Sequence, residues 1–291
     1  MALVVITGTS SGIGLATAIA LGRAGHNVHA TMRNPSRAPE LAQITAAEKL
    51  PITISAMDVD SDSSVKGSIA RITREAGPIE VLVNNAGIER TGSVEELPLE
   101  EFRAVMETNY FGAIRCIKSV LPEMRARRSG CIINVTSVAG RNAAAPFAAY
   151  TASKHALEAF SEAMAQEMKP FNVRVAIVEP FIFDTPMVRR VAVPHSPSPY
   201  PQQRRNAALY QAILKNPAPP SIVGEKVLEI VESKTWRLRH PVGPGVEEFL
   251  KWRASMSDEE WVDWGAQDDD AWYEHVKTDL GIDASPRAEF V

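Results

Sequence analysis

The chain has 291 residues, of which 45% are hydrophobic and 23% charged, as is usual for a globular protein with a large core. The formal net charge of −4 is unevenly distributed, because residues 245–291 hold 13 acidic and 4 basic side chains. Without a basic stripe elsewhere, this balance argues against a nucleic-acid partner. Two cysteines exclude a disulfide framework, and the lack of a long apolar run argues against a membrane-spanning helix.

The first residues, MALVVITG, lack the basic region of a signal peptide, so we expect a cytoplasmic protein. The acidic run at 268–270 lacks the spacing of a calcium loop. No metal site is therefore expected.

Two kinds of apolar pattern alternate along the first 180 residues. Short β-branched runs predict strands at 3–7, 27–31, 52–57, 79–84, 131–136 and 173–179. Between them, apolar residues at helical spacing predict helices near 12–24, 61–76, 100–127 and 148–169. This alternation predicts an α/β fold: a doubly wound, Rossmann-like parallel sheet with helices on both faces.

The sequence changes character after Pro180. Prolines crowd residues 186–220, which predicts a long irregular excursion that serves as a substrate lid. A helix (221–233) and a last strand (237–243) complete a single domain, residues 1–244. Residues 245–291 form an acidic C-terminal extension with four tryptophans. We expect it to pack on the domain, because free tails rarely hold so many aromatic residues.

The first predicted strand runs into TGTSSGIG (7–14), which opens a helix. Glycines at such a junction let the backbone approach a pyrophosphate, and the helix N-terminus adds positive potential. The alternative is an ordinary glycine-rich turn, but the position between strand and helix favours a phosphate loop. The expected phosphate-binding residues are Gly8, Ser10, Ser11, Gly12, Ile13 and Gly14.

The end of the second strand bears on which nucleotide binds. An NAD binder usually places Asp or Glu there, to accept hydrogen bonds from the ribose. Here HATMRN has Thr31 at that point and Arg33 just beyond it. Because an arginine can form a forked contact with a 2′-phosphate, the sequence predicts NADP(H). NAD(H) is the alternative if Arg33 is only a solvated surface residue.

The segment YTASK places Tyr150 and Lys154 four residues apart, on one face of a helix. A phenol has an ordinary pKa near ~10, and a cation nearby lowers that pKa. In isolation such a pair is more often a solvated helix face. With the glycine loop and Ser137 before it, the pair predicts a general acid/base, and Ser137 would hydrogen-bond the substrate oxygen.

Five motifs in this order resemble the short-chain dehydrogenase/reductase (SDR) family, and in particular its NADP(H)-preferring members. The resemblance covers residues 3 to about 243 and rests on TGTSSGIG, NNAG (84–87), ETNYFG, NVTS (134–137) and YTASK. It implies that Asn109 anchors a chain of waters and that Lys154 also binds the nicotinamide ribose. The implied catalytic tetrad is Asn109, Ser137, Tyr150 and Lys154.

The resemblance also implies cofactor contacts outside the glycine loop. Among them, Asp58 matches the residue beside the adenine, and Thr185 matches the residue near the nicotinamide carboxamide. In one departure, Phe181 replaces the glycine that the family usually has after Pro180, which implies a bulkier wall or an altered backbone. The implied contacts are Asp58, Val59, Asn85, Ala86, Gly87, Tyr150, Lys154, Pro180 and Thr185.

Together these features predict an oxidoreductase that transfers a hydride between NADP(H) and a small-molecule carbonyl or alcohol. The expected substrate wall is apolar and partly aromatic, which favours a hydrophobic or aryl ketone or secondary alcohol. His195, in the proline-rich segment, is a weak candidate for a substrate contact. The expected wall residues are Val138, Ala139, Ala144, Ala145, Phe147, Phe181, Phe183, Met187 and Val188.

Three alternatives share the fold: a dehalogenase-like lyase, an enoyl reductase, and a nucleotide-sensing scaffold without activity. The intact glycine loop argues against the first, the Tyr–Lys spacing against the second, and the complete tetrad against the third. The resemblance further implies a homodimer or homotetramer, formed through the helices near 100–127 and 148–169. The acidic extension would block the second interface and leave a dimer.

Overall fold

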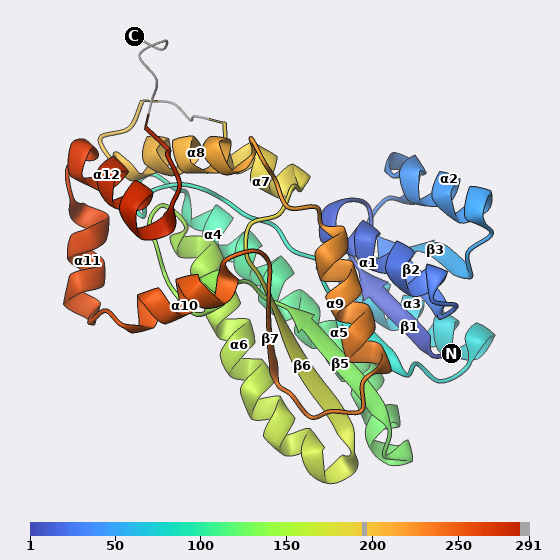
Figure 1. Cartoon of the computed structure of the whole chain (residues 1–291). Coiled ribbons are helices and arrows are strands. Elements are labelled where there is room, and N and C mark those ends of the chain that lie inside the picture. Colours follow the sequence, from blue (N-terminus) through green and yellow to red (C-terminus); the bar gives the residue numbers. More distant parts are fainter. Residues whose placement is uncertain (194–196, 286–291) are drawn as a thin grey trace.

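The computed structural model describes residues 1–193 and 197–285, so His195 lies outside the described residues. The chain folds around one seven-stranded sheet of order β3-β2-β1-β4-β5-β6-β7, in which all paired strands are parallel (Figure 1). This confirms the predicted single, doubly wound, Rossmann-like domain. The strands are β1 (Leu3–Thr7), β2 (Asn27–Met32), β3 (Ile52–Ala56), β4 (Val81–Asn84), β5 (Gly130–Val135), β6 (Val173–Pro180) and β7 (Arg239–Val242).

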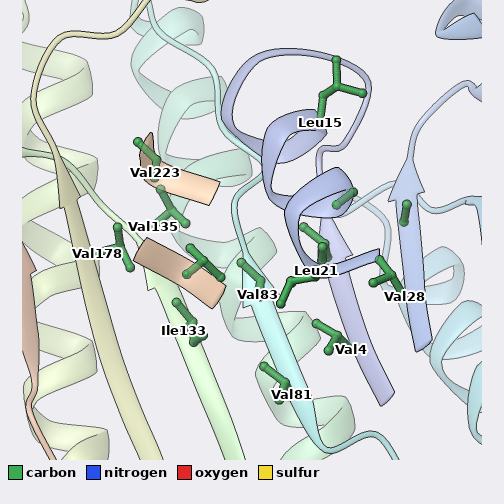
Figure 2. Packing of buried hydrophobic residues seen from close by; sticks show 14 of the residues in the cluster. Val4, Leu15, Leu21, Val28, Val81, Val83, Ile133, Val135, Val178 and Val223 are labelled. Carbon is green, nitrogen blue, oxygen red and sulfur yellow. The ribbon is translucent and has the colours of Figure 1, made fainter. Parts of the chain in front are cut away.

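Helices cover both faces of the sheet because most of the strands are apolar on both sides. On one face α1, α2 and α9 pack in a core, in which Leu21 lies near Val83 and Val223 lies near Val135 (Figure 2). On the other face α3, α5 and α6 form the second core. The helices are α1 (Gly12–Arg23), α2 (Pro39–Glu48), α3 (Asp62–Ala76), α4 (Leu99–Met106), α5 (Gly112–Arg127), α6 (Ala148–Met168), α7 (Pro186–Val191), α8 (Gln202–Ile213), α9 (Ser221–Glu232), α10 (Val246–Ala254), α11 (Asp258–Ala266) and α12 (Asp269–Leu280).

The strand order reverses between β1 and β4. From β1 the chain winds outward through β2 and β3, then returns to β4 on the other side of β1. Open parallel sheets bind ligands in the crevice at the carboxyl ends of such strands. The glycine loop follows β1 and the NNAG segment completes and follows β4, so both lie at this crevice.

Several helices differ from the predicted ones. The helix expected at 100–127 is interrupted by a π-helical turn, Glu107–Phe111, and α2 was not predicted. The proline-rich segment holds α7 and α8 instead of an entirely irregular chain. Pro186 occupies the start of α7, where no N–H is needed, and Pro201 directly precedes α8. These prolines therefore set where the helices begin.

The C-terminal extension forms α10, α11 and α12, of which α12 lies beside α8 (Figure 1). Trp272 and Val276 of α12 pack in a small core with Leu209 of α8. Arg205 of α8 pairs with Asp269 of α12 at 2.6 Å. The proline-rich segment and the extension thus form one contiguous layer.

Two absences hold for the part of the chain that the structure describes. No helix there combines the length and the apolar character needed to cross a membrane. Nor does any group of three or more His, Cys, Asp or Glu side chains come together as metal ligands.

Cys116 and Cys131 are buried, and burial raises the pKa of these thiols to about 12 and about 11.

Candidate active site

The glycine loop after β1 forms a backbone cradle. Gly8 and Gly12 have φ angles of 70° and 57°, which residues with a Cβ rarely adopt. A Cβ on Gly14 would lie 2.3 Å from the Gly8 carbonyl oxygen and 2.4 Å from Asn85 Nδ2. The loop leads into the N-terminus of α1, whose amides and positive potential suit a pyrophosphate. The residues present therefore fit a dinucleotide.

Asn85 fixes this loop. Its Nδ2 donates to the carbonyl oxygens of Thr7 (2.9 Å) and Gly8 (3.0 Å). Thr7 Oγ1 in turn accepts the backbone N–H groups of Asn85 and Ala86. The ends of β1 and β4 are thus tied together beside a cavity of about 700 Å³. The expected cofactor residues that line this nucleotide cavity are Gly8, Ser10, Ser11, Gly12, Ile13, Gly14, Arg33, Val59, Asn85, Ala86, Gly87, Tyr150, Lys154 and Thr185.

Two expected cofactor residues, Asp58 and Pro180, do not line the nucleotide cavity. Asp58 Oδ1 accepts the N–H of Asp60 at 3.1 Å, and it is Asp60 that faces the cavity. Burial raises the pKa of the Asp60 carboxyl. The carbonyl oxygen of Pro180 accepts a long hydrogen bond, 3.5 Å, from Ser137 Oγ. The sequence MDVD has an acid at both positions, and only the turn after β3 decides which one faces the cavity.

The end of the nucleotide cavity beyond β2 is basic. Arg33 and Arg37 line it, and both side chains are exposed. No sequence pattern indicated Arg37, which the 3₁₀ turn Pro35–Arg37 brings to the same cavity as Arg33. Thr31 is enclosed in the sheet instead, where its hydroxyl donates to the Ile6 carbonyl oxygen at 2.9 Å.

Tyr150 and Lys154 lie one turn apart on α6. Lys154 Nζ donates to the Val135 carbonyl oxygen at 2.9 Å and lies 5.6 Å from the centre of the Tyr150 ring. Ser137 follows β5, and its Oγ accepts the N–H of Ala139 at 3.1 Å. Tyr150 lines both the nucleotide cavity and a second cavity, which Ser137 also lines. The structure therefore brings these three expected residues together where the two cavities meet.

Burial has the largest effect on the pKa values of Tyr150 and Lys154. It raises the pKa of Tyr150 to about 12, although a hydrogen bond with Ser137 acts to lower it. It lowers the pKa of Lys154 to about 8, against the opposing effect of Glu158. The sequence suggested that a nearby cation lowers the pKa of the Tyr150 phenol. In the protein without cofactor, burial has the larger effect, and this pKa is raised instead.

Asn109 lies in the π-helical turn and is buried. Its Oδ1 accepts the N–H of Ile88 at 2.8 Å, and its Nδ2 donates to the Ile88 carbonyl oxygen and to Ser153 Oγ, both at 2.9 Å. These bonds join the chain after β4 to α6, three residues from Tyr150. π-helical turns often occur at functional sites.

Behind Lys154, a largely buried ion-pair network joins α6 to β6 and β7. Glu158 accepts from the Thr136 hydroxyl at 2.6 Å and from Arg239 Nε at 3.1 Å. Glu179, which is fully buried, lies 3.7 Å from the same guanidinium, and burial raises the pKa of its carboxyl. No sequence pattern marked these acids, because they are distant in the chain and meet only at the end of the sheet.

The second cavity, about 590 Å³, is mostly apolar. Phe183 does not line it, because this side chain is only 2% exposed and packs near Gly243. The expected wall residues that do line it are Val138, Ala139, Ala144, Ala145, Phe147, Phe181, Met187 and Val188. The C-terminal extension adds aromatic residues that the sequence analysis did not assign to the wall: Phe249, Trp252, Trp261, Trp264 and Trp272.

Phe181, the departure from the family pattern, connects the domain to the extension. Its N–H donates to the Val242 carbonyl oxygen at 2.9 Å, which continues the pairing of β6 with β7. Its ring centre lies 5.2 Å from that of Phe249 in α10. The bulky residue thus forms an aromatic part of the cavity wall and leaves the strand pairing intact.

The fold and the site geometry agree with the comparisons with known proteins. The family model for short chain dehydrogenases matches residues 2–194. The uncharacterized oxidoreductase YusZ of Bacillus subtilis is 35% identical over 87% of this chain and 92% of its own. A 3-ketodihydrosphingosine reductase of Bacteroides thetaiotaomicron is 34% identical over 84% of this chain and 89% of that protein.

Among solved structures, a variant of actinorhodin polyketide ketoreductase with NADPH is similar, with a TM-score of 0.74 and 27% identity. The match covers 84% of this chain and 97% of that chain. The family model, the relatives and the parallel sheet with its glycine cradle lead to one conclusion: the chain belongs to the short-chain dehydrogenase family and is an oxidoreductase of that family.

Proposed function

We propose that the chain transfers a hydride between NADP(H) and a hydrophobic ketone or secondary alcohol, with Tyr150 as the general acid/base. The position of Tyr150 supports this most directly, because its side chain lines both the nucleotide cavity and the apolar cavity. A group at that junction can exchange a proton with a substrate that also faces the nicotinamide. The similarity to a relative named as a ketone reductase adds support.

When bound, the cofactor supplies the hydride to the carbonyl carbon. Ser137 then hydrogen-bonds the carbonyl oxygen, and Tyr150 donates its proton to that oxygen as negative charge develops, which yields the alcohol. With a pKa of about 12, Tyr150 is protonated at neutral pH and suits this direction. Oxidation requires a lower phenol pKa, which the Lys154 ammonium and a positively charged nicotinamide would provide.

Lys154 and Asn109 complete the proposed tetrad in supporting roles. Lys154 lines the nucleotide cavity while the Val135 carbonyl oxygen holds its ammonium, a position suited to a ribose hydroxyl. The contacts of Asn109 with Ile88 and Ser153 hold α6 beside the chain that follows β4. We assign Asn109 to the positioning of Tyr150, with the proposed chain of waters as its second role.

The basic end of the nucleotide cavity supports NADP(H) over NAD(H). Arg33 and Arg37 are both exposed there, and β2 ends in Met32 with no carboxylate to bind a free ribose. Two guanidinium groups can share the oxygens of a 2′-phosphate. NAD(H) would leave both of them without a partner on the cofactor.

The direct test mixes the purified protein with NADPH and a panel of aliphatic and aryl ketones, and follows the nicotinamide absorbance. Ketone-dependent oxidation of NADPH, faster than that of NADH, supports the proposal. If NADPH binds but no ketone or aldehyde promotes its oxidation, and no alcohol promotes the reduction of NADP+, the scaffold alternative is favoured. A failure to bind either nucleotide would favour the dehalogenase-like alternative.

A further inference from the structure

The apolar cavity extends well beyond the reacting groups. It begins at Ser137 and Tyr150 and reaches Trp264 of α11, Trp272 of α12 and Ile282 just after α12. Its volume of about 590 Å³ lies in the range that takes drug-sized ligands. Reduction of a small ketone would use only the end near Tyr150, so most of this cavity is available to the remainder of a larger substrate.

We infer that the substrate is a carbonyl compound with a long, uncharged, apolar tail, and that the tail lies against the tryptophans of the C-terminal extension. This inference rests on the proposed function, because it takes Tyr150 as the position of the carbonyl. The proposed tail site, the tryptophan wall, is defined as Trp252, Trp261, Trp264 and Trp272.

The tryptophan wall is a continuous aromatic surface. Trp261 and Trp264 stack with their ring centres 5.4 Å apart and their planes within 7°. Trp252 and Trp272 contact Trp264 at 5.4 and 6.1 Å. Trp252 also lies 5.8 Å from Phe249, whose ring meets Phe181 at the end of β6. The aromatic surface therefore runs from the region of the reacting groups to α12.

Hydrogen bonds within the protein occupy two indole N–H groups of this wall. Trp261 Nε1 donates to the Ala143 carbonyl oxygen at 2.6 Å, and Trp264 Nε1 donates to Asp279 Oδ2 at 2.9 Å. These indoles consequently offer a tail their ring faces and edges. A polar tail would lose its hydration at these two rings without gaining hydrogen bonds from their N–H groups.

Over the part of its lining that the structure describes, the cavity offers no uncompensated positive charge to an anionic tail, because its one lining cation is paired with Asp269. Among the described residues, only Glu89 and Arg205 are charged side chains lining it. Glu89 raises the pKa of Tyr150, so its negative charge lies toward the reacting end. Arg205 is 2% exposed, its Nε donates to Asp269 Oδ1 at 2.6 Å, and its guanidinium lies 5.8 Å from the Trp272 ring. The carboxylate of Asp269 therefore compensates this enclosed cation, although Arg205 Nη1 has no hydrogen-bond partner among the described residues.

The wall is also connected to the segment that precedes α6. Trp261 bonds the Ala143 carbonyl oxygen, and Asn206 of α8 donates to the Ala145 carbonyl oxygen at 3.0 Å. Both carbonyls belong to the loop between Ser137 and Tyr150. Trp261 of the extension and Asn206 of α8 therefore both fix the loop that forms the near side of the cavity.

A series of straight-chain methyl ketones from five to thirteen carbons tests the inference, with NADPH as the reductant. If the tail is buried against the wall, kcat/KM rises about threefold per added methylene until the cavity is filled. A thirteen-carbon ketone ending in a carboxylate should be reduced at least tenfold less efficiently than its uncharged analogue. No dependence on chain length, or a preference for the carboxylate, would overturn the inference.

Two variants test whether the dependence on chain length arises at the tryptophan wall. Trp264→Ala removes the central ring, and Gly265→Leu adds bulk at a lining residue where a new Cβ meets no heavy atom within 4 Å. Because leucine is a better helix former than glycine, the second variant keeps the test valid if the first fails to fold. Both should lower kcat/KM at least tenfold for the thirteen-carbon ketone and less than threefold for the five-carbon one. Trp236→Ala, at an exposed tryptophan outside the cavity, is the control and should change neither.

Binding without turnover separates this inference from the proposed reaction. Quenching of tryptophan fluorescence by the thirteen-carbon ketone gives a Kd that needs no chemistry. Tight, length-dependent binding that Trp264→Ala weakens supports the tail site even if no ketone is reduced. If short ketones are reduced but ketones of every chain length bind with the same Kd, the proposed function stands and the tail site is refuted.

Discussion

At the scale of single residues, one arginine can discriminate between two cofactors that differ by one phosphate. Arg33 is exposed at the basic end of the nucleotide cavity, and Arg37 faces the same cavity. A forked contact from a guanidinium contributes only when a phosphate is present to accept it. A carboxylate in place of Arg33 would repel the phosphate and could accept bonds from a free ribose.

Arg33→Asp should therefore lower kcat/KM for NADPH by about tenfold or more, and leave NADH equal or improved. Arg74→Asp is the control, since Arg74 is an exposed arginine on α3 that does not line the cavity. The ratio of kcat/KM for the two cofactors is measured in all three proteins. A wild type that already prefers NADH, or an unchanged ratio in Arg33→Asp, would refute the NADP(H) assignment.

At the scale of elements, the turn between β1 and α1 has no room for a side chain at Gly14. A Cβ on Gly14 would lie 2.3 Å from the Gly8 carbonyl oxygen and 2.4 Å from the Asn85 amide that fixes the loop. Gly14→Ala should therefore displace the loop and raise the Kd for NADPH at least tenfold, despite the better helix propensity of alanine. Gly67→Ala is the matched control, because a Cβ there meets nothing within 4 Å.

The control variant should gain about 0.5–1 kcal/mol of stability and keep the Kd, since Gly67 is an exposed glycine inside α3. Thermal unfolding and nucleotide titration of both variants measure the two effects. NADPH binding by Gly14→Ala at wild-type strength would show that the cradle does not hold the pyrophosphate.

The ion-pair network between α6 and the strands predicts a pH effect. Glu158 acts to raise the pKa of Lys154, which burial lowers to about 8. If the charged lysine is needed, reduction is lost as the pH rises through that pKa. Glu158→Gln removes the supporting charge, so the alkaline limit of activity should move to lower pH. The other groups around Glu158, the Thr136 hydroxyl and the Arg239 guanidinium, remain in place.

Glu162→Gln is the control for this prediction. Glu162 bonds the same arginine at 2.6 Å but is half exposed, and it is not among the groups that shift the pKa of Lys154. Profiles of kcat/KM between about pH 6 and 11 are compared, a range that brackets the ordinary and shifted lysine pKa values. An identical alkaline limit in wild type and Glu158→Gln would contradict the proposed role of Lys154.

At the scale of the whole molecule, the sequence predicted the sheet well because buried parallel strands are continuous apolar runs. The strand expected at 3–7 is observed at Leu3–Thr7, and the motif residues follow the strand ends as expected. Features that depend on distant packing were missed. Three features could be seen only in the folded chain. Asp60 and Arg37 line the nucleotide cavity, and the tryptophan wall lines the apolar cavity. Local patterns carry no information on such contacts.

The oligomeric state is a further prediction at this scale. We expect a homodimer or homotetramer in solution, formed through α4, α5 and α6. Phe111 supports this, because the side chain is 45% exposed beside α5 in the single chain. Light scattering at micromolar concentration gives the mass, and a monomer alone would contradict the prediction.

The central claim is that Tyr150 moves the proton. The most direct measurement compares Tyr150→Phe with Tyr210→Phe, which removes another phenol of the same apolar cavity. For each protein, NADPH binding is titrated and the ketone-dependent oxidation of NADPH is followed. We predict that Tyr150→Phe still binds NADPH, with a Kd within about tenfold of wild type, but loses about 10²–10⁴-fold in kcat, while Tyr210→Phe keeps kcat within about tenfold. Turnover by Tyr150→Phe close to that of wild type would contradict the account.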